Sequence, residues 1–394
     1  METSFEPIMP GVYRSSMLER VYWGRPVADA LVDELRVGEA RRIFVVTNRS
    51  LAATPVPATL IGSLGERFVG SYAGVTAHAP RSCVIEAAAL ARAARADLLL
   101  ALGGGSVIDA TKVVALCLRH GYTETAQLEP HANIRPLDAG QRPDDADQWL
   151  RIIAVPTTLS GAEFAASAGL TDPARGLKHA FVAPMQMPRA IILDPAMTMV
   201  TPLALLQSTA MKAVDHAVER MTSITANAYS DTVSELALRM LGEALDAIGE
   251  RPEDLDPRSR LQFGMFMSLR GAAAGVAVNV SHAIGHVLGA HAGVPHGQTS
   301  GVVLPAVLRW NREATAAAQR RIAAAMGRSD GDAAAAVEAL ARRLGLPSRL
   351  REVAVKQEDF PMIARKTMQE MLLRNSRKPV GGPQDIEAIL QLAW

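Results

Sequence analysis

Short apolar runs alternate with helical stretches through the first half of the chain, and this alternation limits the fold more than any other feature. The runs at 42–47 (RIFVVT), 97–102 (DLLLAL) and 151–156 (RIIAVP) are apolar and too short for helices, so they indicate buried strands. Helical patterns lie between them, for example over 82–94 and from Ser106 to about 119. Strands and helices that alternate at this spacing predict βαβ units and a parallel sheet.

Strand patterns end near the middle of the chain. Further strands are predicted over 67–74 and 190–193, and the polar stretch 121–147 is predicted to be a surface loop. After Asp194-Pro195 only helical patterns follow, over 203–221, 229–249, 258–274, 282–291, 314–326 and 333–344. The sequence therefore predicts an α/β domain over residues 1–196 and an all-helical domain over residues 197–394.

Composition narrows the choice of partners and compartment. The 394 residues carry 41 Lys and Arg against 40 Asp and Glu, so the charge balance predicts no attraction to nucleic acid or to an anionic membrane. No segment approaches the roughly 18 consecutive apolar residues of a membrane span, and the first nine residues do not read as a signal peptide. Cys83 and Cys117 each stand alone in apolar surroundings, so we expect two buried thiols and a cytoplasmic protein.

A glycine loop follows the strand at 97–102. Gly103, Gly104 and Gly105 would let the backbone approach a ligand closely, and Ser106 opens a helix whose first amides attract anions. This pattern predicts a phosphate or pyrophosphate cradle. The loop lacks the Gly-x-Gly-x-x-Gly spacing of the usual dinucleotide fingerprint, so a plain tight turn is the alternative.

A second loop, PTTLSGAE at 156–163, follows the strand at 151–156. Thr157, Thr158 and Ser160 offer three hydroxyl groups that suit contacts to ribose, phosphate or amide groups. The same stretch could instead form a capping box, with Ser160 as the helix cap and Glu163 three residues further on. The two interpretations are compatible.

Histidines gather in the second half of the chain. His282 and His286 are four residues apart and share one helix face, and His296 follows after a turn. His216 lies one helical turn after Lys212 on an earlier helix. Several histidines on neighbouring helices are typical of a divalent-metal site, so this group predicts a polar active site.

Taken in order, these motifs resemble the iron-containing (group III) alcohol dehydrogenase family. The resemblance covers roughly residues 15–394. Within the family, the runs TLSGAEF (158–164) and GVPHG (293–297) look closest to the maleylacetate reductase branch. The motifs that carry it are Gly103-Gly104-Gly105-Ser106-x-x-Asp109-x-x-Lys112, Pro156-Thr157-Thr158-x-Ser160-Gly161-x-Glu163, Asp194-Pro195, His282-x3-His286-x-x-Gly289 and Pro295-His296-Gly297.

The resemblance implies a Rossmann-like domain followed by a helical domain, the fold shared with dehydroquinate synthase, with the active site in the cleft between them. It implies a homodimer and an NAD or NADP cofactor, with the pyrophosphate on Gly103, Gly104, Gly105 and Ser106. His286 would lie near the nicotinamide and the substrate. Matching positions imply further cofactor contacts from Asp109, Thr157, Thr158, Ser160 and Lys178.

The end of the strand at 42–47 bears on the choice of cofactor. An acidic residue there would bind the adenosine ribose and repel a 2′-phosphate. This chain has Asn48, which is neutral, followed by Arg49, which is basic. Asn48 is thus a predicted cofactor contact, and both NADH and NADPH remain open.

One position departs from the family pattern. Members that hold iron or zinc use an Asp and three His, and the matching residues here are Lys212, His216, His282 and His296. An ammonium at about 4 Å would repel a dication by several kcal/mol at an effective dielectric of about 20. Maleylacetate reductases also lack the full ligand set. We therefore expect no bound metal.

In place of the ion, we expect the Lys212 ammonium to polarise the substrate carbonyl or hold a carboxylate, while His286 or His282 passes a proton. A salt bridge from Lys212 to Asp215 or Glu219 is the alternative. The expected catalytic residues are Lys212, His216, His282, His286 and His296.

The leading prediction is a metal-independent, NAD(P)H-dependent reductase of a small oxo or unsaturated carboxylic acid. The first alternative is an alcohol dehydrogenase that holds zinc or iron through His216, His282 and His296. The second alternative is a nucleotide-binding relative with non-redox chemistry.

Overall fold

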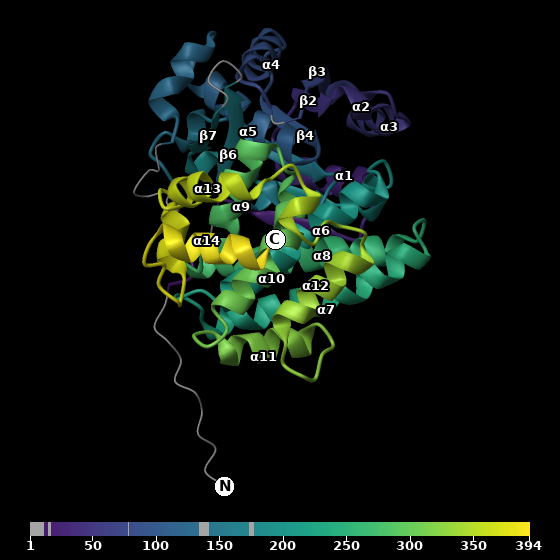
Figure 1. The fold of residues 1–394 in the computed structure, drawn as a ribbon. Helices are drawn as coiled ribbons and strands as arrows, with labels where there is room; N and C mark the ends of the chain where they lie inside the picture. The colour runs from purple at the N-terminus through teal and green to yellow at the C-terminus, as the bar shows by residue number, and fades with distance from the viewer. Residues whose placement is uncertain (1–11, 15–16, 78, 134–141, 173–176) are drawn as a thin grey trace. The chain divides into compact units, whose positions relative to one another are not determined.

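The computed structural model describes residues 12–14, 17–77, 79–133, 142–172 and 177–394, apart from the side chains of residues 177, 178 and 296. These residues form two compact units. Figure 1 shows the chain coloured from its N-terminus to its C-terminus. Of the described residues, those within 17–206 and Glu253–Gln262 form the α/β unit. Those within 12–14, Gln207–Pro252 and Phe263–Trp394 form the helical unit.

A parallel sheet of six strands forms the centre of the α/β unit, in the order β1-β8-β5-β4-β2-β3. Five of these strands are the predicted runs, each within one residue of its expected bounds. The sixth, β1, has four residues and gave no usable pattern. The strands are β1 (Arg20–Trp23), β2 (Ile43–Asn48), β3 (Phe68–Val75), β4 (Leu98–Gly103), β5 (Arg151–Pro156) and β8 (Ala190–Leu193).

Helices cover both faces of this sheet. On one face, α1 (Val27–Val37) and α3 (Pro55–Leu64) share a core with Leu98, Leu100 and Leu102 of β4. On the other face, α4 (Arg81–Ala93) and α5 (Gly105–His120) share a core with the alternate β4 residues, Leu99 and Ala101. Because each strand is buried on both faces, its sequence is continuously apolar rather than alternating. Cys83 and Cys117 are buried in the second core, as predicted.

A hairpin that the sequence did not predict extends from this unit. Strand β6 (Ser167–Asp172) pairs antiparallel with β7 (Leu177–Val182) as a separate two-stranded sheet. The Thr171 amide donates to the carbonyl oxygen of Ala79, just before α4. Contacts with α4 and α5 therefore fix the hairpin, and its own short runs carry little strand signal.

The described residues beyond β8 contain helices and no strand, as the sequence predicts. The helices α9, α10, α13 and α14 share one apolar core, which includes Ile284, Val303, Ile363 and Ile389. Within the described residues, no helix combines the length and apolar character needed to cross a bilayer. The helices are α6 (Leu203–Met221), α7 (Ala228–Glu250), α8 (Leu255–Arg270), α9 (Val280–Ala292), α10 (His296–Trp310), α11 (Ala316–Ala325), α12 (Ala333–Arg343), α13 (Phe360–Thr367) and α14 (Pro383–Leu392).

The central strand β4 gives a direct test of the core. Leu100 has no exposed surface, whereas Leu90 on α4 is 49% exposed. We expect Leu100→Ala to lower the free energy of unfolding by about 2–5 kcal/mol, because it removes buried methyl groups and leaves a cavity. Leu90→Ala makes the same chemical change at the surface and should shift it by less than about 1 kcal/mol. Denaturant unfolding followed by circular dichroism measures both, and equal losses would contradict this core assignment.

Candidate active site

The glycine loop packs directly against the second loop. A Cβ atom on Gly104 would lie 3.1 Å from Thr158 Cγ2, and one on Gly105 would lie 2.8 Å from Ser160 Oγ. Gly103 has a φ of +154°, and a Cβ atom there would lie 2.7 Å from Val107 Cγ2. A side chain at any of the three positions would press on a neighbour, and at Gly104 and Gly105 that neighbour is the second loop.

These loops lie where open α/β sheets bind ligands. Strands β2 and β4 are neighbours, but the chain continues from β2 to β3 on one side and from β4 to β5 on the other. Such a reversal creates a crevice at the carboxyl ends of the strands, where nucleotides bind in folds of this type. Asn48 ends β2, the glycine loop ends β4 and the second loop ends β5. This edge of the α/β unit could hold a dinucleotide.

Several predicted cofactor residues have well-defined roles in the protein itself. Asn48 caps α2 (Arg49–Ala52), because its Oδ1 accepts a hydrogen bond from the Leu51 amide at 2.8 Å. The Thr157 amide donates to the Gly103 carbonyl oxygen at 3.1 Å and so ties the two loops together. Asp109 Oδ2 accepts from the Gly169 amide of β6 at 3.1 Å. The Lys178 side chain lies outside the described residues.

The capping-box interpretation of the second loop is wrong. The short helix that follows spans Ala162–Phe164, and its cap is Gly161 in the left-handed conformation. A cap at Ser160 would need the helix to begin one residue earlier. Ser160 instead packs beside Gly105, which leaves the hydroxyl-rich loop as part of the candidate cofactor site.

The helical unit brings the predicted histidines together. Helix α6 carries Lys212 and His216, and α9 carries His282 and His286. The rings of His216 and His282 stack with centroids 4.8 Å apart and an angle of 21° between their planes. His296 is the first residue of α10, and its side chain lies outside the described residues.

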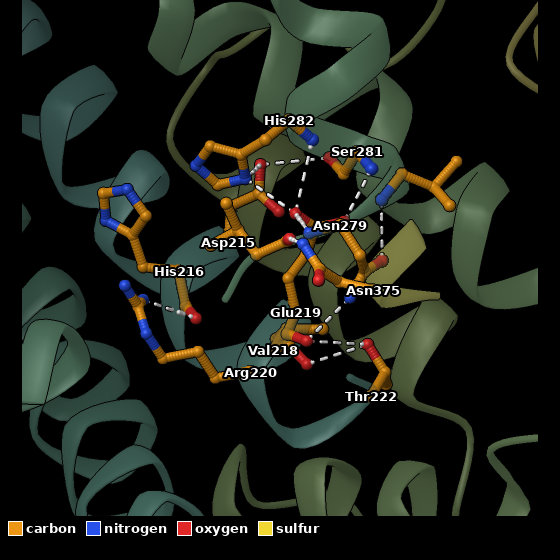
Figure 2. Close-up of polar contacts among 12 residues, drawn as sticks. Asp215, His216, Val218, Glu219, Arg220, Thr222, Asn279, Ser281, His282 and Asn375 are labelled. Carbon is orange, nitrogen blue, oxygen red and sulfur yellow. Dashed lines mark hydrogen bonds and ion pairs between the residues drawn. The ribbon is translucent and has the colours of Figure 1, made fainter. Parts of the chain in front are cut away.

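Glu219 of α6 anchors the start of α9. Its carboxylate accepts hydrogen bonds from the backbone amides of Asn279 (2.9 Å) and Ser281 (2.6 Å). The Asn279 side chain returns a hydrogen bond to the Glu219 carbonyl oxygen at 2.8 Å. Figure 2 shows these groups, together with His282, converging on Glu219. The carboxylate thus satisfies amides that the first turn of α9 leaves without helical partners.

The same carboxylate sets the orientation of His282. Its Nδ1 lies 2.7 Å from Glu219 Oε2. When Glu219 is ionised its oxygens can only accept, so the ring nitrogen acts as the donor and the lone pair of the neutral ring is on Nε2. Sequence reasoning named Glu219 only as a possible partner of Lys212. Its main partners lie some sixty positions further along the chain, which no local pattern reveals.

Burial controls protonation in this cluster. Loss of solvent raises the pKa of Glu219 to about 7 and that of Asp215 to about 6. Burial also lowers the pKa of His282 to about 3, against the attraction of Asp215, and the positive charge of Lys212 lowers it further. His282 is therefore neutral at pH 7.

His286 differs from His282 in its surroundings. Its side chain is 44% exposed, and its Nδ1 lies 3.3 Å from Glu370 Oε2. A solvent-exposed imidazole beside a carboxylate can exchange protons with water, so it suits a proton donor better than buried His282 does.

The donor set does not match the metal site expected from the resemblance. Three of the four positions have a described side chain. Two are the imidazoles of His216 and His282, and the third is the amine of Lys212, which replaces the expected carboxylate. An ammonium cannot ligate, and it raises the local positive charge. With Lys212 protonated, these residues do not fit a dication.

A second group of potential metal ligands, Asp215, Glu219 and His282, lies within the described residues. Asp215 Oδ2 accepts from Ser281 Oγ at 3.0 Å, and Glu219 accepts from α9 as described. Asp215 lies 3.7 Å from His282 Nδ1, the same ring nitrogen that contacts Glu219. These contacts form a hydrogen-bonded support for α9 rather than an open metal site.

Comparison with known proteins identifies the family for most of the chain. The family described as iron-containing alcohol dehydrogenase matches residues 19–195, and its C-terminal counterpart matches residues 207–394. Maleylacetate reductase 2 of Cupriavidus pinatubonensis is 32% identical over 328 residues, which cover 82% of this chain and 80% of the relative. Lactaldehyde reductase of Escherichia coli K12 is 27% identical over 393 residues, which cover 97% and 99%.

The fold has solved counterparts as well. Sulfoacetaldehyde reductase from Bifidobacterium kashiwanohense, solved in complex with NAD+, superposes with a TM-score of 0.86 at 21% identity and covers 97% of this chain and 98% of that one. This similarity confirms the predicted fold class. The chain therefore belongs to the iron-containing alcohol dehydrogenase family, as its motifs predicted, and is an NAD(P)-dependent oxidoreductase.

Proposed function

We propose that this chain reduces a small oxo or unsaturated carboxylic acid with NADH or NADPH, and that it does so without a metal ion. The similarity to maleylacetate reductase 2 supports this substrate class. The observation that carries the proposal is Lys212, which stands one helical turn before His216 where metal-binding relatives would need a carboxylate.

The charges around Lys212 favour an anionic substrate. The positive charge of Lys212 acts on His282, whose ring stacks on His216. The nearby acidic residues Asp215 and Glu219 bond to the first turn of α9. The cluster therefore combines an ammonium with the neutral imidazole of His282, which suits a carboxylate or a developing alkoxide.

A bound NADH or NADPH would supply a hydride to the carbonyl carbon, or to the far carbon of a conjugated C=C bond, and would be oxidised to NAD(P)+. In both cases the displaced electron pair moves onto the carbonyl oxygen, as an alkoxide or an enolate. The Lys212 ammonium stabilises that oxygen. His286 in its protonated form then donates a proton to the alkoxide oxygen or the enolate carbon, and it recovers a proton from solvent. His282 is held in place by its contact with Glu219 and positions the neighbouring His216 ring, on which it stacks.

We assign cofactor binding to the carboxyl edge of the parallel sheet. The pyrophosphate would lie on Gly103, Gly104, Gly105 and Ser106, at the start of α5. The second loop, which packs on these glycines, would contribute Thr157, Thr158 and Ser160. Asn48 would add an outer contact.

A second candidate is a zinc- or iron-dependent alcohol dehydrogenase. The contact of His282 Nδ1 with Glu219 favours it, because metal-ligating histidines commonly donate their other ring nitrogen to a carboxylate. The side chain at position 212 argues against it, since this candidate needs Lys212 to be neutral or turned away.

Removing the ammonium tests the catalytic role. We expect Lys212→Met to lower kcat by about 100- to 1,000-fold with an oxo-acid substrate, the usual effect of losing a group that stabilises an oxyanion. Lys212→Arg keeps the positive charge and should retain part of the activity. Lys366→Met, an exposed lysine on α13, is the matched control and should leave kcat unchanged. Oxidation of NADH or NADPH, followed by absorbance, gives the rates, and full activity in Lys212→Met would refute the role.

Metal content separates the two candidates. Protein purified without chelator should contain far less than one ion of zinc or iron per chain, and chelator treatment should leave its activity intact. Lys212→Asp supplies the missing carboxylate and should raise the metal content toward one ion per chain. One equivalent of metal in the natural chain, with activity lost on its removal, would establish the metal-dependent candidate instead. Tight cofactor binding without turnover of any oxo acid or aldehyde would refute both.

A further inference from the structure

We propose that Lys112 is a positioning residue for the nicotinamide cofactor: it fixes the second loop against the glycine loop from within the core. This inference rests on the cofactor binding proposed above and assigns a role to a lysine that touches no substrate.

Lys112 is fully buried on the second turn of α5, where an amine is stable only if its donors are satisfied. Its Nζ donates hydrogen bonds to the carbonyl oxygens of Ala162 (2.6 Å), Ala165 (2.7 Å) and Ser167 (2.8 Å). An ammonium has three N–H bonds, so each donor has a backbone acceptor. Lys112 is thus bound to a single segment, residues 162–167, which runs from the second loop into β6.

The neighbouring charges are consistent with a protonated amine. Asp109 Oδ1 lies 4.0 Å from Lys112 Nζ. Burial lowers the pKa of Lys112, whereas the negative charges of Asp109 and Glu163 act in the opposite direction. The three carbonyls add further stabilisation, because charged donors make the stronger hydrogen bonds.

The segment held by Lys112 continues directly from the residues that contact the glycines. Thr158 and Ser160 pack on Gly104 and Gly105, and the tighter contact leaves only 2.8 Å for a Cβ atom. Two residues beyond Ser160, Ala162 provides the first carbonyl of the clamp. A shift of the segment would therefore move Ser160 over the surface where the pyrophosphate is expected.

Helix α5 holds the next part of the chain as well. Asp109 Oδ2 accepts from the Gly169 amide, so acidic and basic side chains one turn apart fix the loop and the first half of β6 to one helix. The same helix begins at the glycine loop. The glycine loop and the second loop, on the two sides of the expected cofactor site, are thus both attached to helix α5. Because α5 holds them in place, less conformational freedom is lost when the cofactor binds.

The test compares two variants that each remove a buried charge from the same unit. Lys112→Met keeps the length of the side chain and removes its donors. The matched control is Glu34→Gln on α1, because Glu34 is also almost fully buried. Glu34 forms ion pairs with Arg20 (2.6 Å) and Arg189 (2.9 Å). These arginines lie at the amino ends of β1 and β8, away from the carboxyl ends where the cofactor is expected. Both variants should melt at lower temperature than the natural chain.

Only Lys112→Met should weaken the cofactor. We expect its Kd for NADH and NADPH to rise about 10- to 100-fold, the size of effect that follows when binding groups are displaced by an ångström. At saturating cofactor, its KM for the oxo acid should stay within about threefold of the natural value. Glu34→Gln should keep the natural Kd. A normal Kd in Lys112→Met, or an equal rise in Glu34→Gln, would overturn the positioning role.

A measurement on the natural chain covers the case in which Lys112→Met does not fold. Addition of NADH or NADPH should slow hydrogen exchange of the amides in residues 158–169, because the ordered loop contacts the cofactor. Unchanged exchange in a chain that binds the cofactor would overturn the inference. Failure of the natural chain to bind either cofactor would instead refute the proposed function.

Discussion

Glu219 accepts hydrogen bonds from the first amides of α9 and from the ring of His282, and the geometry of the candidate catalytic cluster depends on that set of contacts. The carboxylate fixes where α9 begins relative to α6. That placement stacks His282 on His216 and leaves His286, one turn further along, in contact with solvent. His282 and His286 lie on one helix face but thus have different environments: His282 is buried and His286 is exposed to solvent.

The α/β unit uses the same physical device with the opposite charge. Lys112 donates to three backbone carbonyls, much as Glu219 accepts from backbone amides. A buried ion is costly unless hydrogen bonds satisfy it, so each ion is stable only in one arrangement of the backbone around it. In each unit a charged side chain therefore fixes a backbone segment that carries functional groups: a loop in the α/β unit and the start of α9 in the helical unit.

Much of the fold could be predicted because its strongest signals are local. The runs that form β2, β4 and β5 are continuously apolar because they are buried on both faces, and α6 has the predicted bounds. The β6–β7 hairpin could not be predicted in this way. It takes its shape from contacts with α4 and α5 rather than from its own sequence.

The candidate site shows the same division. Residue types and spacing were enough to select the glycine loop, the hydroxyl-rich loop and the histidines. They did not reveal that Asn48 caps a helix, that Asp109 bonds to Gly169 or that Glu219 supports α9, because each partner is set by the tertiary structure. The role of Lys112 was equally hidden, although its position in the motif was recognised.

The clamp on residues 162–167 has a consequence for how related sequences diverge. Lys112 binds this segment only through main-chain carbonyl oxygens. The contact therefore does not depend on which side chains stand at 162, 165 and 167. The segment can exchange those side chains over time and still follow the same course. In a set of distant homologues, we therefore expect the lysine to be retained even where the sequence of the loop has changed too much to be aligned.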